Sequence, residues 1–187
     1  MFAPVKFTVS APGKVILFGE HSVVYGKPAL AASINKRTSL VLETTSSCNV
    51  EIRFSNLDFE IKLLVDEIDG LTLTRGSSDR LDFKTSFELA KSDVTNLKNS
   101  ENFSANQTTS LQCIFYLLRG MFSGQKISTG FKLVLSSELS IGAGTGSSAS
   151  FAVCLAAALY QLRRILQVEG KGDSEDLGEF LLKVSVS

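Results

Sequence analysis

A glycine-rich run followed at once by a long apolar segment is the feature that most constrains this 187-residue chain. The run, Gly142 to Ala149, has glycines at three alternate positions and two serines before the apolar residues 151–166. Glycine permits backbone conformations that other residues rarely adopt. Since residues 151–166 favour a helix, the serines mark a helix N-terminus, with unpaired N–H groups and a partial positive charge. The pattern predicts a loop that cradles a phosphate.

Two familiar phosphate motifs fit the run poorly. No Gly-Lys-Ser/Thr closes it, as a P-loop requires. Residues 144–149 formally match the dinucleotide fingerprint, but residues 161–167 continue the predicted helix and supply no acidic residue at the end of a second strand. The simpler alternative is a structural turn between a strand and a helix. Three alternate glycines and paired serines exceed what such a turn needs, so phosphate binding is favoured.

Composition and charge are those of an ordinary globular protein. Apolar residues make up 44%, and 19 basic residues balance 19 acidic ones, which gives no reason to expect a nucleic-acid or anionic-membrane partner. Without eighteen consecutive apolar residues, no membrane span is expected. Residues 1–10 alternate like a strand and do not resemble a signal peptide, so we expect a cytoplasmic protein. The spacing of the cysteines predicts neither a zinc site nor a disulfide framework: Cys48, Cys113 and Cys154.

Strand patterns dominate the first part of the chain and helical patterns the last. Strands are expected at 5–9, 14–18, 29–34, 39–44, 50–54, 57–63 and 131–135, with turns at 11–13 and 55–56. Helical spacing is found at 111–122, 151–166 and 177–184. Between residues 65 and 102 the pattern is weak, and Gly70, residues 76–78 and residues 98–100 indicate loops. This order of elements predicts an α+β domain.

Two further segments carry residues with useful chemistry. Lys14 follows the Pro12-Gly13 turn at the start of a strand, within reach of a phosphate or an acidic side chain. Glu20 precedes His21, the only histidine of the sequence. Taken alone, each has a simpler interpretation, as a surface lysine and as a hydrogen-bonded loop histidine. Because no pattern places an acidic partner for His21, a hydrolytic triad is unsupported.

Together these segments resemble the sequence motifs of the GHMP kinases. Residues 10–21 read Ser-Ala-Pro-Gly-Lys-Val-Ile-Leu-Phe-Gly-Glu-His, like the first motif, and residues 138–149 are similar to the second. Within the family, residues 19–27 and 154–159 look most like the mevalonate kinases. The resemblance implies that residues 1–187 form the N-terminal ATP-binding domain, truncated at its C-terminal end. That domain has a ribosomal protein S5 domain 2-like fold with a left-handed βαβ crossover, and the C-terminal ferredoxin-like domain is expected to be missing.

The resemblance also implies roles for particular residues. Lys14 is expected to be catalytic and to contact phosphate, and Glu20 and His21 are expected to lie beside the substrate, mevalonate. ATP and Mg²⁺ are the implied cofactors, with Ser148 as a metal ligand. Mevalonate would be phosphorylated to 5-phosphomevalonate, and homodimers occur in the family. The implied nucleotide-binding residues are Lys14, Asn56, Ser137, Gly142, Ala143, Gly144, Thr145, Gly146, Ser147 and Ser148.

Some features depart from the family pattern. Ser140 and Ile141 replace two prolines, which loosens the entry to the loop, and Thr145 replaces a leucine. The family's catalytic aspartate, its glutamate metal ligand and its third glycine-rich motif would follow residue 187. We therefore expect no mevalonate-dependent ADP release from these residues alone, and poor solubility where helix faces are exposed. The alternatives are a non-catalytic fragment or isoform that binds nucleotide or a full-length subunit, and another GHMP kinase.

Overall fold

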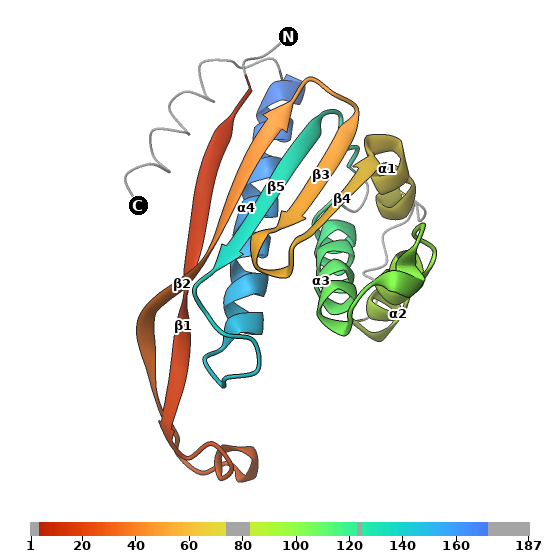
Figure 1. The fold of residues 1–187 in the computed structure, drawn as a ribbon. Helices are drawn as coiled ribbons and strands as arrows, with labels where there is room; N and C mark the ends of the chain where they lie inside the picture. Colours follow the sequence, from red (N-terminus) through yellow and green to blue (C-terminus); the bar gives the residue numbers. More distant parts are fainter. Residues whose placement is uncertain (1–3, 74–82, 123–124, 172–187) are drawn as a thin grey trace. The chain divides into compact units, whose positions relative to one another are not determined.

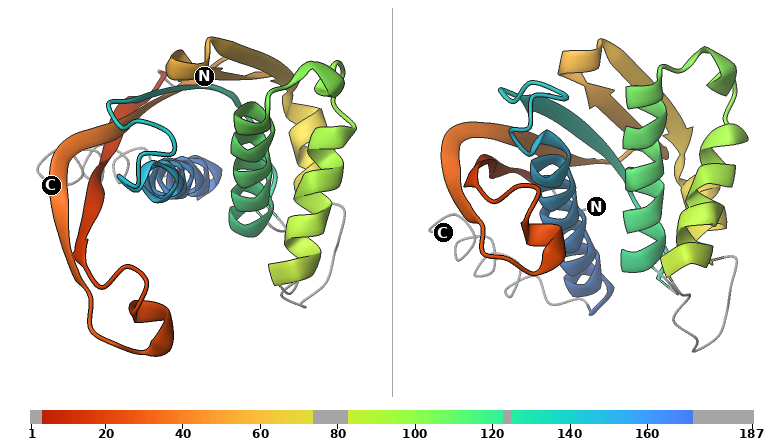
Figure 2. Two further views of the ribbon diagram at one scale, coloured as in Figure 1. Left: turned by 60° about the horizontal axis from the view of Figure 1, so that its bottom comes forward. Right: turned by 90° about the horizontal axis from the view of Figure 1, so that it is seen from below.

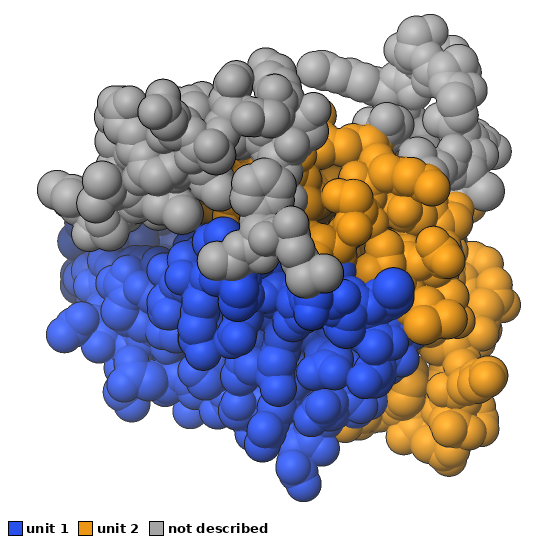
Figure 3. Space-filling view, turned by 90° about the horizontal axis from the view of Figure 1, so that it is seen from above, with its two compact units in different colours: residues 1–63, 130–158 blue, residues 64–129, 159–187 orange. Residues whose placement is uncertain are grey.

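The computed structural model describes residues 4–73, 83–122 and 125–171 of the chain. The helical pattern at 177–184 and the loop expected at 76–78 lie outside these ranges. The chain divides into two compact units, one of residues 1–63 and 130–158 and the other of residues 64–129 and 159–187 (Figure 3). Strands fill the first unit and helices dominate the second, which confirms the α+β class (Figure 1).

The first unit contains a five-stranded sheet with the order β1-β2-β5-β3-β4. Strand β2 pairs antiparallel with β1 and β5, whereas β3 pairs parallel with β5. The parallel pair requires a long crossover, and the chain makes it through the second unit before it returns as β5. The strands are β1 (Lys6–Phe18), β2 (Leu30–Thr45), β3 (Asn49–Phe54), β4 (Phe59–Leu64) and β5 (Gly130–Ser137).

One face of the sheet forms the core of the first unit. Leu40 lies opposite Leu135 and Leu42 opposite Leu133, and all four are buried. The first half of helix α4 (Ser147–Lys171) packs on this side, where the thiol of Cys154 donates to the carbonyl of Thr38. Alternation of apolar and polar residues therefore predicts the buried face of these strands correctly.

The opposite face of the sheet carries a row of charges of alternating sign. Lys6 pairs with Glu43 at 2.9 Å, and Glu51 pairs with Lys62 at 3.1 Å and with Lys132 at 3.7 Å. Glu43 and Glu51 both lie opposite Lys132 in the strand register, and Lys6 lies opposite Glu43. The row gives the sheet the one apolar and one solvated face that is common in antiparallel sheets.

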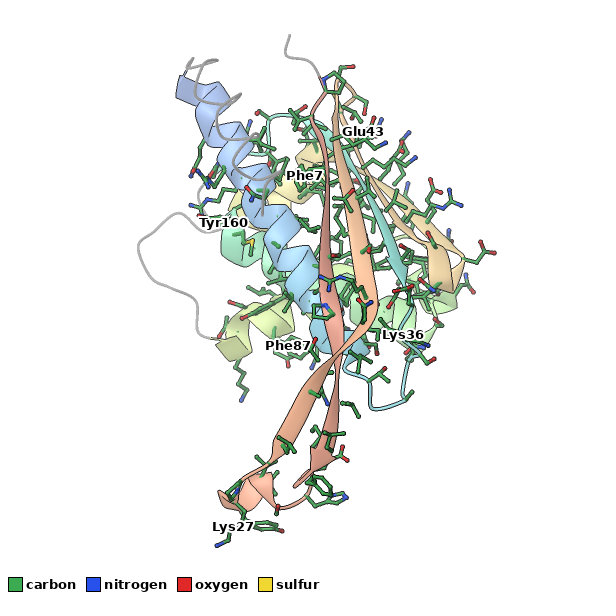
Figure 4. The ribbon with its side chains drawn as sticks, turned by 90° about the vertical axis from the view of Figure 1, so that its left-hand side faces the viewer. Phe7, Lys27, Lys36, Glu43, Phe87 and Tyr160 are labelled. Atoms are coloured by element: carbon green, nitrogen blue, oxygen red, sulfur yellow. The ribbon has the colours of Figure 1, made fainter. Side chains whose placement is uncertain are left out.

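Strands β1 and β2 are longer than the sequence predicts. The strands expected at 29–34 and 39–44 form the single strand β2, which begins at Leu30, and β1 runs through the turn expected at 11–13. That turn is a wrong prediction, because the chain passes Pro12 and Gly13 as a shift in strand register, not as a reversal. On the N-terminal side of Thr38, β2 pairs only with β1, and these two strands leave the sheet as a two-stranded ribbon. Lys27, labelled in Figure 4, lies at the end of this ribbon.

The second unit contains helices α1 (Val65–Leu73), α2 (Phe83–Thr95) and α3 (Ala105–Met121), with α2 and α3 side by side (Figure 2). Gly70 lies inside α1 and not in the expected loop. Helix α3 begins before the predicted residue 111 because the Ser104 side chain and Gln107 form a reciprocal capping box. In α3, Met121 is half-buried, whereas four of the apolar residues at the predicted helical spacing are buried: Leu111, Ile114, Phe115 and Leu118.

Helix α4 is the one described helix whose length and composition would allow it to cross a membrane, over Ser147–Gln167. The sequence predicts no membrane span because it has no eighteen consecutive apolar residues. Polar residues also interrupt this helix, although it is apolar on average. Cys154, Leu155 and Ala158 are buried in the first unit. A core helix passes the same test of length and composition.

Candidate functional site

The glycine run forms a loop between β5 and α4, as the sequence predicts. Gly142, Gly144 and Gly146 have φ values of 77°, 69° and 76°, in the left-handed region that favours glycine. Helix α4 begins at Ser147, immediately after the third glycine. A Cβ at Gly142 or Gly144 would meet no atom within 4 Å, so this part of the loop faces open space.

Strand β1 holds the middle of the loop in place. The backbone N–H of Lys14 donates to the carbonyl of Thr145 at 2.9 Å. A Cβ at Gly13 would lie 2.8 Å from the same carbonyl oxygen, so the close approach requires a glycine. At the start of α4 the hydroxyl of Ser150 donates to the carbonyl of Ala11 at 2.7 Å. The bulge at Pro12 and Gly13 thus has a specific role, because it carries the contacts between β1 and the loop.

The Lys14 side chain lies along the loop. Its Cγ is 2.9 Å from where a Cβ of Gly146 would stand, and its Nζ is 3.5 Å from the carbonyl oxygen of Gly144. Within the described part of the chain, no backbone N–H from Gly142 to Gly146 donates a hydrogen bond. Free N–H groups, an ammonium and the N-terminus of a helix together favour an anion. The structure therefore brings together the lysine and the loop that the sequence singled out.

Asn56 and Ser137, both expected at the nucleotide, bind each other. The Asn56 amide donates to the Ser137 carbonyl at 2.8 Å and accepts from the Ser137 N–H at 2.6 Å. The Ser137 hydroxyl is also engaged, with Thr38 Oγ1 at 2.9 Å and with the N–H of Leu139 at 3.2 Å. These bonds fix the end of β5, from which the chain enters the loop.

Glu20 and His21 lie in the turn at the end of the ribbon, before the 3-10 helix Val23–Tyr25. Both side chains are exposed, and neither is bonded to another residue of the described ranges. The structure therefore leaves them available to a ligand without placing them against the glycine loop.

The described residues contain no group of three or more His, Cys, Asp or Glu side chains suited to hold a metal ion. Ser148 is exposed in the first turn of α4. Burial raises the pKa of the Cys113 and Cys154 thiols above the ordinary value, so both favour the neutral form.

Sequence reasoning missed two residues at the entry to the loop, Arg37 and Glu138. The Glu138 carboxylate accepts the backbone N–H of Arg37 at 3.0 Å, and Arg37 Nε donates to Ser10 Oγ at 2.9 Å. Glu138 lies within the motif-like segment 138–149, yet nothing in the spacing of that segment indicates a carboxylate bonded to a strand. Only the pairing of β2 with β5 brings it there.

Comparison with known proteins shows which proteins this chain resembles. Residues 110–185 match the family described as "GHMP kinases N terminal domain". Mevalonate kinase from Mus musculus is 40% identical over 162 residues and that from Homo sapiens 37% identical over 152 residues, each match covering 81% of this chain and 38% of the relative. The crystal structure of the Methanococcus jannaschii mevalonate kinase aligns with a TM-score of 0.56 and 22% identity, over 90% of this chain and 48% of that chain.

The fold is therefore that of a GHMP kinase N-terminal domain. The chain spans less than half the length of these relatives. In sequence the chain is similar to the mevalonate kinases of mouse and human.

Proposed function

We propose that the loop from Gly142 to Ser148 binds the phosphates of ATP together with Lys14. The observation that carries the proposal is the position of the Lys14 side chain along a loop whose three glycines have left-handed φ values. Backbone N–H groups and an ammonium are the donors that phosphate oxygens need. The kinase relatives make ATP the expected phosphate donor.

The arrangement suits phosphoryl transfer, because that reaction depends mainly on positioning and on neutralising charge. Loop N–H groups would hold the phosphates, and Lys14 would offset charge that develops on them. Mg²⁺ supplies further charge neutralisation when it arrives with ATP, and the Ser148 hydroxyl is the ligand that this chain would offer it. The remaining steps need a group that orients the attacking hydroxyl.

Mevalonate is the proposed acceptor, with Glu20 and His21 as its binding residues. Mevalonate is a hydroxy acid, so an imidazole suits its carboxylate and a carboxylate suits its hydroxyl groups. Both side chains are exposed at the end of the ribbon. The similarity to the mevalonate kinases of mouse and human favours this acceptor over those of other GHMP kinases.

Nucleotide binding is the activity we propose for these 187 residues themselves. The matched part amounts to 38% of the mouse relative, so transfer to mevalonate is proposed for a polypeptide of the relatives' full length. Such a protein would be a cytoplasmic enzyme of isoprenoid and sterol synthesis. Turnover by this chain near the median of about 10 s⁻¹ for enzymes generally would overturn the assignment of binding alone.

Calorimetric titration with ATP, with and without Mg²⁺, tests the proposal on the full chain and on Lys14→Ala. Lys14→Ala should weaken binding about tenfold or more, equivalent to about 1.4 kcal/mol, because it removes a charged partner of the phosphates. Lys36→Ala is the matched control, since Lys36 is an exposed lysine on the same ribbon (Figure 4). Wild-type protein that releases no heat with ATP, or equal losses in the two variants, would contradict the proposal.

A further inference from the structure

The pairing of β2 with β5 ends in an unusual way. The last regular pair is Thr38 with Ser137. One position further in the same register, the N–H of Glu138 donates to the Arg37 carbonyl at 2.9 Å, as in an ordinary ladder. The N–H of Arg37, however, donates to the Glu138 carboxylate at 3.0 Å. A side chain thus replaces the backbone carbonyl that an antiparallel pair would use.

This replacement lies where both strands change course. Beyond Thr38, β2 leaves the sheet and continues only in the ribbon with β1. On the other strand, the chain turns after Ser137 toward the buried Leu139 and then Gly142. Because the Glu138 side chain satisfies the Arg37 N–H, the backbone of β5 is free to turn at this residue.

The side chain of Arg37 carries the connection on to β1. Its Nε donates to Ser10 Oγ at 2.9 Å and its Nη2 to the Ser10 carbonyl at 3.2 Å. Arg37 also lies opposite Pro12, next to the shift in strand register. The guanidinium thus adds two bonds between β2 and β1 close to a proline, which has no N–H to donate to the ladder.

Four residues after Ser10 on β1, the N–H of Lys14 donates to the Thr145 carbonyl at 2.9 Å. The loop is therefore fixed to the same pair of strands twice. At its entry Glu138 binds Arg37, and at its middle Thr145 binds Lys14. A change at the entry would alter the distance between the loop and Lys14.

We propose that Glu138 is a positioning residue for the glycine loop, acting through the backbone N–H of Arg37 to set the loop against Lys14. The inference rests on the proposed function for its effect on ATP, but its effect on the loop is independent of any ligand. The part of Glu138 that matters is a hydrogen-bond acceptor, so glutamine should replace it and alanine should not.

The test compares wild type, Glu138→Ala and Glu138→Gln by hydrogen exchange at the Arg37 and Lys14 amides and by calorimetry with ATP and Mg²⁺. In Glu138→Ala, both amides should exchange about tenfold faster, and ATP should bind about tenfold more weakly. Glu138→Gln should stay within about threefold of wild type in both measurements. Glu60→Ala, an exposed glutamate of β4, is the control and should change neither.

Unchanged exchange at Lys14 in Glu138→Ala would overturn the inference. Equal losses in Glu138→Ala and Glu138→Gln would also overturn it, because they would show that the charge of Glu138 acts directly on the ligand. If wild-type protein binds no ATP, the proposed function fails, while the exchange rates still decide whether Glu138 positions the loop.

Discussion

The side chain of Lys14 lies directly against Gly146, since a Cβ added to this glycine would stand 2.9 Å from Cγ of the lysine. Gly146 also has a φ of 76°. Glycine is therefore required at this position for two separate reasons, its backbone conformation and the space that the lysine occupies. The position of the Lys14 side chain, which we propose binds phosphate, therefore depends on the glycine loop.

Replacement of Gly146 by alanine should weaken ATP binding about tenfold or more, because it displaces Lys14. Gly26→Ala is the control, since Gly26 has a φ of 71° but open space around its Cβ position. Both variants carry the cost of a left-handed alanine, about 1–2 kcal/mol. The two variants should therefore unfold at similar temperatures but differ in their affinity for ATP, measured by calorimetry. Equal affinities for ATP would show that Lys14 is not held by the loop.

Asn56→Asp should destabilise the end of β5. The amide donates to the Ser137 carbonyl, and a carboxylate in its place would face that carbonyl without a proton to share. The expected loss is about 1–3 kcal/mol in the free energy of unfolding, measured by urea denaturation at neutral pH. Asn35→Asp, an exposed position on the ribbon, should change stability by less than about 0.5 kcal/mol. Comparable losses at the two positions would refute a specific role for the Asn56 amide.

The sequence predicts local features of this fold better than long-range ones. The glycine loop and the start of α4 at Ser147 follow from short patterns, since glycine conformation and helix initiation are local properties. The path of β1 through Pro12 and Gly13 depends on its pairing with β2, which no short window contains. Helices α1 and α2 were missed because their apolar positions are few and Gly70 resembles a breaker.

The same distinction applies to the candidate site. Lys14 and the loop were brought together by the resemblance to the GHMP kinases, since nothing local connects them across 130 residues. The sequence does not predict the pairing of Asn56 with Ser137. The Asn56 side chain binds the N–H and the carbonyl of Ser137 as the backbone of a neighbouring strand would, and this contact is apparent only once the strands are placed.

Removing one partner of the bond between Asp93 on α2 and Arg119 on α3 should strongly destabilise the second unit. Both carboxylate oxygens accept from the guanidinium, at 2.7 and 2.8 Å, and the side chains are only 10% and 12% exposed. Asp93→Ala should cost about 3–5 kcal/mol because it leaves a buried charge unpaired. Glu88→Ala, which removes an exposed pair on the same helix, should cost less than about 1 kcal/mol. Similar losses in urea denaturation would contradict this ranking.

Self-association of the chain should depend on the ribbon. The residues Leu111, Ile114 and Leu118 of α3 are buried, whereas Val24 and Tyr25 are 76% and 81% exposed. Val24→Ser with Tyr25→Ser should therefore raise the concentration at which the protein stays monodisperse in ultracentrifugation. Tyr160→Ser, on α4 and 54% exposed, is the single-site control and should have a smaller effect. If both changes act alike, general apolar exposure and not the ribbon is responsible.

Alkaline pH should lower the free energy of unfolding because of the thiols of Cys113 and Cys154. Burial raises the pKa of Cys113 and Cys154 in the folded state, so the unfolded chain releases these protons first. The contribution is fully present below the unfolded pKa of about 8.5 and is lost as pH rises through the folded pKa. Stability in urea should fall across this range, and less so in Cys113→Ala than in wild type. Cys48 is exposed, so Cys48→Ala should follow the wild-type curve, and iodoacetamide at pH 8 should modify Cys48 first. An identical pH dependence in wild type and Cys113→Ala would show that burial of the Cys113 thiol does not contribute.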